Sequence, residues 1–335
     1  MRKWFAVLVS ACVAGLMLLA AAGCGGASKD GSTAGGQSGG GKYHIVVLAW
    51  PTSDPFFGAL QKGTAEAAKD LGQDVKYAFP TQSNPQIPDW INLLKQVVAS
   101  KPDALVVADF FPDQADGILA SASKSGIPIV LINSGDIEKV GALAFIGTTY
   151  VAEGAAGAKK MVEAGVKKAL YVQHCAGTAA CQDRQKGFVD AMKAAGREAT
   201  VLNLTSDQSA NRQAALQAIR GTLVSDKSID GAVSSASQYE PLKQAIAQVG
   251  REVKTGTFEL SNAALQDVAA GKDLFMSDQQ QFLQGYYGVQ VAVQYLKYDI
   301  HPLGHIFTGP RLLDQQDAEK ALKINQTDGG VRGGG

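Results

Sequence analysis

A short segment, residues 50–57, combines three aromatic side chains with one carboxylate. Trp50, Phe56 and Phe57 offer flat faces for the C–H side of a sugar ring, and the carboxylate of Asp54 can accept hydrogen bonds from hydroxyl groups. Structural alternatives remain open. Asp54 before Pro55 is also the pattern of a helix N-cap, and Phe57 could be the first core residue of that helix. We expect this segment to bind a polyhydroxylated ligand.

Other polar side chains stand in the short polar segments that end apolar runs, and we interpret these runs as buried strands. They are Asp109, Asn133, His174, Gln238, Glu259 and Gln279. In open α/β sheets, ligands bind at the carboxyl ends of the strands, so we expect these residues at the same site. Amides and carboxylates suit the hydroxyl groups of a pentose, a hexose or a small polyol. A cluster of carboxylates would also suit an amine-bearing ligand.

The sequence lacks the motifs of common enzymes. It contains neither a Gly-x-Ser-x-Gly elbow nor a phosphate loop ending in Gly-Lys-Ser/Thr. His301 and His305 have the spacing of a metal pair, but Pro302 and Gly304 lie between them and prevent a shared helix face. We interpret that pair as part of a surface loop. We therefore expect no catalytic residue, no cofactor and no metal ion.

Length and charge narrow the class of protein. The chain has 335 residues, enough for two domains at roughly 150 residues each. Its 31 basic and 31 acidic side chains give a net charge of zero. A nucleic-acid-binding domain carries a basic surface, so we exclude a nucleic-acid partner. We expect a monomer, and the 46% apolar content is sufficient for full cores.

The first 41 residues carry signals for export rather than for folding. Arg2 and Lys3 precede an apolar run, 5–22, which ends in small residues before Cys24. This pattern resembles a bacterial lipoprotein signal, 1–23, whose cleavage leaves Cys24 to be lipidated. The alternative is a transmembrane anchor, because about 18 apolar residues could just span a bilayer. Residues 24–41, rich in Gly and Ser, then form a flexible tether, and the folded part lies outside the cytoplasm at the membrane.

Two cysteines remain in the mature fold. Cys12 lies inside the signal, which leaves Cys175 and Cys181. Thiols outside the cytoplasm tend to oxidise, and the loop between the two residues is short. We expect a disulfide there. The alternative is a Cys175 nucleophile beside His174.

Strands alternate with helices along the rest of the chain, which predicts an α/β fold with parallel sheets and right-handed crossovers. The expected strands of a first lobe are 45–49, 75–79, 105–108, 127–132 and 145–147, and its helices are 57–71, 89–100 and 115–125.

A second run of the same kind predicts a second lobe. Its expected strands are 169–172, 201–204, 231–233, 254–258 and 274–276, and its helices are 152–164, 184–195, 209–224, 241–249 and 263–270. Pro241 would occupy the first turn of its helix. A long helix, 282–298, follows, and we expect a frayed, Gly-rich tail from residue 321.

Four segments, in this order, resemble the periplasmic sugar-binding proteins of ABC importers, ribose-binding type. They are Asp-Pro-Phe-Phe at 54–57 with Gly63 and Leu71-Gly72, Gly-Ile-Pro-Ile-Val at 126–130, Phe-Ile-Gly at 145–147 with Glu153-Gly154, and Arg-Gln-Lys-Gly-Phe at 184–188. The resemblance covers nearly all of the mature chain. It implies two doubly wound, Rossmann-like lobes joined by a three-segment hinge.

The same resemblance implies the limits of the lobes. The first lobe is 42–147 plus 280–308, and the second is 148–279 plus 309–326, with a disordered tail at 327–335. The crossings between them are expected near 147–148, 279–280 and 308–311. In the family, the long helix packs back on the first lobe.

The resemblance also implies ligand-binding roles for Asp109, Asn133 and Arg184, which match family positions. Arginine offers a rigid fork of donors, although Arg184 could instead form an ion pair on a helix surface. Gln279 matches the glutamine that ends the last cleft strand.

The sequence departs from the family at three places. Ser237-Gln238 stands where the family has Asn-Asp, Glu259 replaces Asp, and Ser134 replaces Arg. These differences leave the fold prediction unchanged but bear on the identity of the ligand.

The mechanism that the resemblance implies is closure of two lobes around the ligand, followed by docking on an ABC permease. Two alternatives remain open: a ligand sensor of the same fold that signals to a membrane receptor, and a secreted hydrolase.

Overall fold

The computed structural model describes residues 41–82 and 85–332. The proposed signal, nearly all of the tether, Cys12 and Cys24 lie outside the described residues. In the part of the chain that the structure describes, no helix has the length and apolar character needed to cross a membrane.

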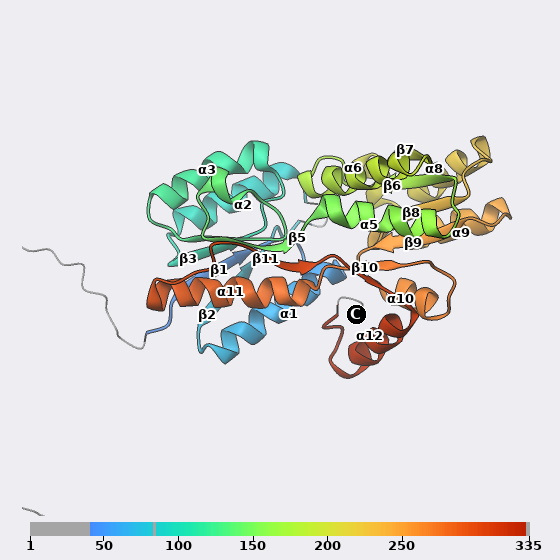
Figure 1. Ribbon diagram of the computed structural model, residues 1–335. Coiled ribbons are helices and arrows are strands. Elements are labelled where there is room, and N and C mark those ends of the chain that lie inside the picture. Colours follow the sequence, from blue (N-terminus) through green and yellow to red (C-terminus); the bar gives the residue numbers. More distant parts are fainter. Residues whose placement is uncertain (1–40, 83–84, 333–335) are drawn as a thin grey trace, which may run out of the picture. The chain divides into compact units, whose positions relative to one another are not determined.

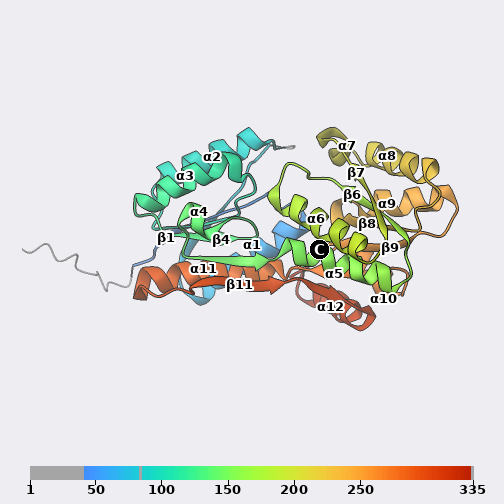
Figure 2. The same ribbon diagram turned by 45° about the horizontal axis from the view of Figure 1, so that its top comes forward.

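A six-stranded parallel sheet forms the first lobe, in the order β11-β5-β4-β3-β1-β2 (Figure 1). Its strands are β1 (His44–Leu48), β2 (Asp74–Ala78), β3 (Ala104–Val107), β4 (Ile129–Ile132), β5 (Ala144–Thr148) and β11 (Gly304–Gly309). Its helices are α1 (Pro55–Asp70), α2 (Ile87–Ala99), α3 (Pro112–Lys124), α4 (Ile137–Val140) and α11 (Gln281–Tyr298). Figures 1 and 2 show α2 and α3 on one side of this sheet and α1 and α11 on the other.

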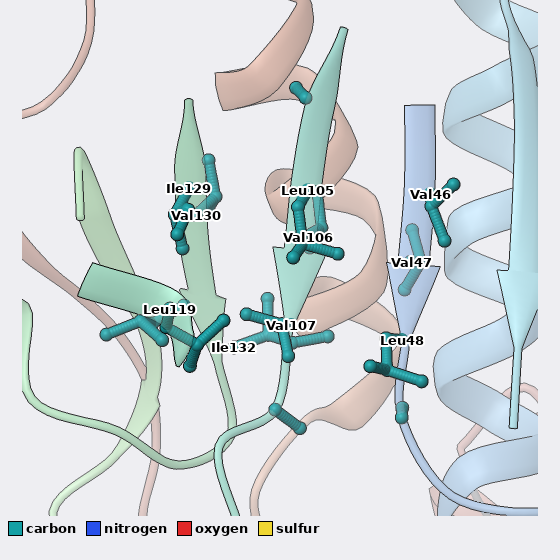
Figure 3. Packing of buried hydrophobic residues seen from close by; sticks show 14 of the residues in the cluster. Val46, Val47, Leu48, Leu105, Val106, Val107, Leu119, Ile129, Val130 and Ile132 are labelled. Carbon is teal, nitrogen blue, oxygen red and sulfur yellow. The ribbon is translucent and has the colours of Figure 1, made fainter. Parts of the chain in front are cut away.

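The central strands are apolar at every position because both faces of the sheet are covered. Val46, Leu105 and Ile129 are at most 2% exposed, and Figure 3 shows these side chains packed together with those of neighbouring positions on β1, β3 and β4. The carboxyl ends of these strands are therefore held rigidly, and the candidate site lies just beyond them.

The second lobe repeats the arrangement, with the order β12-β10-β9-β8-β6-β7. Its strands are β6 (Lys168–Gln173), β7 (Glu198–Asn203), β8 (Gly231–Ser235), β9 (Lys254–Phe258), β10 (Met276–Asp278) and β12 (Arg311–Leu313), of which only β12 is antiparallel to its neighbour. Its helices are α5 (Tyr150–Glu163), α6 (Ala179–Ala194), α7 (Ser206–Ala210), α8 (Arg212–Ser225), α9 (Ala236–Val249), α10 (Asn262–Ala269) and α12 (Gln315–Thr327).

Strand β6 shows how both faces of this sheet are covered. Leu170 and Val172 belong to a core cluster with residues of α8 and α9, whereas Ala169 and Tyr171 belong to a cluster with residues of α5 and α6. Successive side chains of a strand point to opposite faces, so the two helix pairs lie on opposite sides of the sheet.

Glycines bring two helix pairs into close contact. A Cβ at Gly154 of α5 would overlap the carbonyl oxygen of Arg184 of α6, and a Cβ at Gly187 of α6 would overlap that of Val151. A Cβ at Gly63 of α1 would likewise overlap the carbonyl oxygen of Phe282 of α11. The α5–α6 contact matters for the site because each helix carries a buried charged residue.

The chain passes between the sheets at three places, after β5, after β10 and after β11, where the sequence predicts the crossings. Hydrogen bonds join the three segments. The Thr308 hydroxyl donates to the Gln279 carbonyl oxygen at 2.8 Å, and Gln284 Nε2 donates to the same oxygen at 3.2 Å. Thr308 Oγ1 also lies 3.3 Å from the carbonyl oxygen of Gly147. The three crossings thus form one connected hinge.

The two-lobe α/β fold predicted from the sequence is confirmed, but several local predictions are wrong. The helix expected at 209–224 is two helices, because the Asn211 side chain accepts a hydrogen bond from the Ala214 N–H and starts α8 anew. Pro241 lies inside α9, which begins at Ala236, rather than in its first turn. His305 lies in strand β11 instead of a surface loop.

The tail is also more ordered than predicted from residue 321 onward. Helix α12 runs to Thr327, with Asp314 as its N-cap. Ala318 and Ala321 are fully buried, in a cluster that includes Leu265 of α10. Small buried alanines give only a weak apolar pattern, so this helix was not predicted.

Candidate functional site

Arg184 is the central charge of the candidate site. Its side chain is 3% exposed, and its Nε donates to Glu153 Oε2 at 2.7 Å while Nη1 donates to Glu259 Oε1 at 3.1 Å. The guanidinium also lies 5.0 Å from the ring centroid of Tyr150. Burial acts to lower the pKa of Arg184, but the two carboxylates outweigh it and hold the pKa above its usual value. The arginine is therefore a fixed positive charge, and it is buried rather than on a helix surface.

Glu153 holds this arginine from the neighbouring helix. It is fully buried in α5 and also accepts a hydrogen bond from the Ser277 hydroxyl of β10. Burial raises the pKa of Glu153, although Arg184 and Ser277 act in the opposite direction. The close α5–α6 packing at Gly154 keeps the two charged side chains in register.

Tyr150 links Arg184 to the hinge. Its hydroxyl donates to Gln279 Oε1 at 3.3 Å, and Gln279 Nε2, which is buried, has no hydrogen-bond partner among residues 41–82 and 85–332. Asn133 lies nearby, at the end of β4, with Nδ2 3.4 Å from Gln284 Oε1. Three predicted site residues, Asn133, Arg184 and Gln279, thus lie around one aromatic ring. Asn133 and Tyr150 are also near enough to affect each other, since hydrogen bonding to Asn133 acts to lower the Tyr150 pKa that burial raises.

Asp54 and Glu259 bring negative charge from opposite lobes. The Asp54 carboxylate accepts the Phe56 N–H at 2.9 Å and so caps α1, as one of the two predicted roles requires. Burial, and then the charge of Glu259, raises the pKa of Asp54 to about 6. Glu259 has a φ of 78°, a strained conformation for a residue with a side chain, and its carboxylate is held there by Arg184.

His174 and Gln238 belong to the second lobe's side of the site. His174 Nδ1 lies 3.0 Å from the Ser235 hydroxyl, which lies 3.0 Å from that of Ser237. Burial lowers the pKa of His174 to about 4, with Arg184 acting in the same direction, so the imidazole is neutral at pH 7. Gln238 Nε2 donates to the Ser209 carbonyl oxygen at 3.1 Å. Its Oε1 is buried and has no partner in the described part of the chain.

The predicted aromatic residues form a wall in the first lobe. Trp50 and Phe57 each meet the ring of Phe110 edge-on, with centroids 5.7 Å apart. Both remain partly exposed, whereas Phe56 is only 6% exposed and packs against Phe57 at 4.9 Å. Trp50 and Phe57 are therefore better placed than Phe56 to offer a ring face to a ligand. The helix pattern suggests the opposite order for the two phenylalanines, with Phe57 in the core and Phe56 at the ligand.

Asp109 follows β3, next to the end of β4, and its N–H donates to the carbonyl oxygen of Ser134 at 3.0 Å. It is completely buried, and neither of its carboxyl oxygens has a hydrogen-bond partner in the described part of the chain. Its carboxyl group faces Asp116 of α3, and burial followed by this second carboxyl raises the pKa of Asp109 to about 8. That Asp109 binds the ligand together with Asn133 and Arg184 stays a prediction.

Cys175 and Cys181 are joined by a disulfide, with their Cα atoms 5.9 Å apart. It closes the loop between β6 and α6, the helix that carries Arg184. His174 completes a group whose ligand atoms lie within 4.8 Å of one another. Since both sulfur atoms are in the disulfide, neither is available as a thiolate ligand or as a nucleophile.

The sequence reasoning missed two residues of the site, Tyr150 and Glu153. Both lie on α5 one turn apart, and both are at most 8% exposed. A glutamate on the Gly/Ala-rich buried face of a helix was the available signal, because a buried carboxylate requires a partner.

Comparisons with known proteins agree with this architecture. The family described as periplasmic binding protein domain matches residues 45–299. A xylose/arabinose-binding protein from Sulfolobus acidocaldarius, XylF, is 22% identical over 308 residues, which cover 86% of this chain and 75% of that protein.

Two solved structures have the same fold. A carbohydrate transporter from Acidothermus cellulolyticus, in complex with myo-inositol, has a TM-score of 0.77 at 22% identity, with 86% of this chain and 99% of the other covered. GanP, a glucose-galactose binding protein from Geobacillus stearothermophilus, has a TM-score of 0.74 at 19% identity, with 83% and 99% covered.

Proposed function

Since this chain belongs to the periplasmic binding protein family, we propose that it captures a monosaccharide or small polyol between its two lobes. One observation carries the proposal: hydrogen-bonding side chains from both lobes and the hinge meet around Tyr150 and Arg184. Gln279 has a buried amide nitrogen without a partner among the described residues, and Gln238, on the second lobe's side of the site, has a buried amide oxygen without one. Buried polar atoms are nearly always paired, and hydroxyl groups of a ligand would supply both a donor and an acceptor.

The charges around the site favour a neutral ligand over an anionic one. Glu153, Glu259 and Asp54 supply three carboxylates against the single guanidinium of Arg184. An anionic ligand would meet net repulsion, whereas a hydroxyl group can donate to a carboxylate and accept from the arginine. Trp50 and Phe57 add apolar faces for the carbon side of a sugar ring. The ligands named for the relatives, xylose, arabinose, glucose, galactose and myo-inositol, are neutral and polyhydroxylated.

The proposal includes capture by closure and delivery to an ABC permease. The connected hinge at Gly147, Gln279 and Thr308 supports closure, because a few residues at element ends can absorb the change between open and closed forms. We further propose that Cys24 is lipidated and holds the protein at the outer side of the cell membrane. The mass of the mature N-terminal peptide tests this anchor directly.

A thermal-shift screen tests the proposed function. The full chain is mixed with a panel of pentoses, hexoses and polyols, because a ligand that binds only the folded state raises the melting temperature. Calorimetry then gives the affinity for the best ligand. We expect Arg184→Ala to weaken binding at least about tenfold, since the ligand loses a charged hydrogen bond worth roughly 1.5–3 kcal/mol.

Arg220→Ala is the matched control, because Arg220 is exposed on α8. It should bind as the wild type does. Circular dichroism shows whether Arg184→Ala remains folded, since Glu153 loses its buried partner. An unchanged affinity in a folded Arg184→Ala protein removes Arg184 from the site. No shift with any neutral sugar or polyol contradicts the proposed function as a whole.

A further inference from the structure

A cavity of about 360 Å³ lies beside the proposed site. Its walls come from the end of α7 and the starts of α8, α9 and α10 in the second lobe and from Pro55 in the first lobe. Pro55 directly follows Asp54, and Gln238 belongs both to the cavity wall and to the proposed ligand shell. Ser261, two residues after Glu259, also lines it. The cavity therefore adjoins the proposed sugar site rather than lying elsewhere on the surface.

The wall offers hydrogen-bond donors and acceptors together. Helix α9 begins here, and its N-cap residue Ser235 makes no capping hydrogen bond, so N–H groups of its first turn remain available as donors. Gln238 also lines the cavity, and its Oε1 lies buried below the surface without a partner in the described structure. The hydroxyls of Ser237 and Ser261 can act in either sense. This mixture suits hydroxyl groups.

The charges of the cavity argue against an ion as its ligand. Arg212 and Glu240 both line it, and they form an ion pair with each other. Their side chains are 54% and 51% exposed, so each charge is balanced and also in contact with solvent. Pro55, Pro241 and Ala263 supply apolar surface between the polar groups. The cavity thus matches a neutral group with hydroxyls on its edges and C–H bonds on its faces.

Its size matches one sugar ring. A volume of 360 Å³ equals that of about twelve water molecules at roughly 30 Å³ each. A hexose unit has about the same number of carbon and oxygen atoms, and because these are covalently bonded they occupy less space than separate waters, so one unit fits.

We propose that this cavity is a second subsite, which holds the next unit of a ligand longer than a monosaccharide, such as a disaccharide or a glycoside. The first unit would lie among Asn133, Arg184 and Gln279, and the second between Pro55 and the start of α10. This inference rests on the proposed function, because it requires that the first unit is bound between the lobes.

Calorimetry with matched pairs of sugars tests the subsite on the full chain. Suitable pairs are xylose with xylobiose, glucose with cellobiose, and arabinose with arabinobiose. In at least one pair we expect the disaccharide to bind about tenfold tighter than its monosaccharide. Asn262→Trp places a large side chain on the exposed first residue of α10, in the cavity wall. It should remove the tenfold advantage and leave the monosaccharide affinity within twofold of the wild type.

Gln266→Trp is the control variant. Gln266 is also exposed on the same helix, one turn further on, and does not line the cavity. It should keep the preference for the disaccharide. If the wild type binds a monosaccharide but no disaccharide more tightly, or if Asn262→Trp leaves the preference intact, the second subsite is overturned and the proposed function stands. If the wild type binds no sugar of the panel, both proposals fail.

Discussion

Replacing Asp54 with asparagine should stabilise the protein at neutral pH but not in acid. In the folded protein, burial and then the facing charge of Glu259 raise the pKa of Asp54 from 3.8 to about 6. A raised pKa means that the folded state favours the protonated carboxyl group. Below pH 3.8, Asp54 is protonated in both states and does not reduce the free energy of unfolding. As the pH rises through about 6, Asp54 ionises and the folded protein loses this stability.

The size of the effect follows from the same values. Each pH unit between the two pKa values corresponds to about 1.4 kcal/mol, so the unfavourable contribution of Asp54 at pH 7 is at most about 3 kcal/mol. The residue is not fully enclosed, and solvent weakens charge interactions, so we expect about 1–2 kcal/mol. Asparagine removes the charge and still accepts the Phe56 N–H as an N-cap.

Urea unfolding at pH 4, 5, 6 and 7 gives the free energy of unfolding of the wild type and of Asp54→Asn. The difference between the two proteins isolates Asp54, because the other titrating groups are the same in both. The variant should equal the wild type near pH 4 and exceed it by about 1–2 kcal/mol at pH 7. Asp314→Asn changes the exposed N-cap aspartate of α12 and controls for the substitution itself. A stability difference that does not change with pH, or one that favours the wild type at pH 7, refutes the reasoning.

Three further predictions concern the stability of the fold. Gly117→Ala should raise the free energy of unfolding by about 0.5–1 kcal/mol, since Gly117 is inside α3 and an added Cβ meets no atom within 4 Å. Gly154→Ala should lower the free energy of unfolding by about 1–3 kcal/mol, because the Cβ would overlap the backbone of α6. Melting curves test both variants, and the two melting temperatures should move in opposite directions. Replacing Cys175 and Cys181 together by serine should cost about 2 kcal/mol through loop-closure entropy. Reductant should then lower the melting temperature of the wild type but not of the double variant, and a wild type insensitive to reductant contradicts this prediction.

The architecture could be predicted from the sequence because its signals are local and repeated. Each central strand is a continuous apolar run, such as 45–48, and the alternation with helices leaves only a parallel arrangement. The edge strands β11 and β12 escaped prediction. Strand β11 exposes Phe307 at 59% and contains two glycines, so neither its apolar pattern nor its composition is typical of a strand.

Positions at strand ends could also be predicted, but side-chain directions could not. Asn133 ends β4 with a φ of 62°, a left-handed conformation that asparagine adopts more readily than most residues, and its amide reaches Gln284 of the hinge. Asp109 follows the neighbouring strand β3, yet its carboxyl group faces Asp116 of α3. The sequence contains one polar residue at each of these strand ends. Only the backbone conformation and the packing of the next helix decide whether it faces the hinge.

Glu259 illustrates why the centre of the site depends on contacts that are distant in sequence. Its φ of 78° is unfavourable for glutamate, and strain of this kind persists only when the surroundings enforce it. The Glu259 N–H donates to the carbonyl oxygen of Ser277, and its carboxylate binds Arg184, 75 residues earlier, which is held in turn by Glu153 on a third element. An aspartate at position 259 would be one methylene shorter. The longer side chain of Glu259 therefore lets it reach Arg184, which is already paired with Glu153. As a result Arg184 has two carboxylate partners, and Asp54 of the first lobe faces the negative charge of Glu259 in the second.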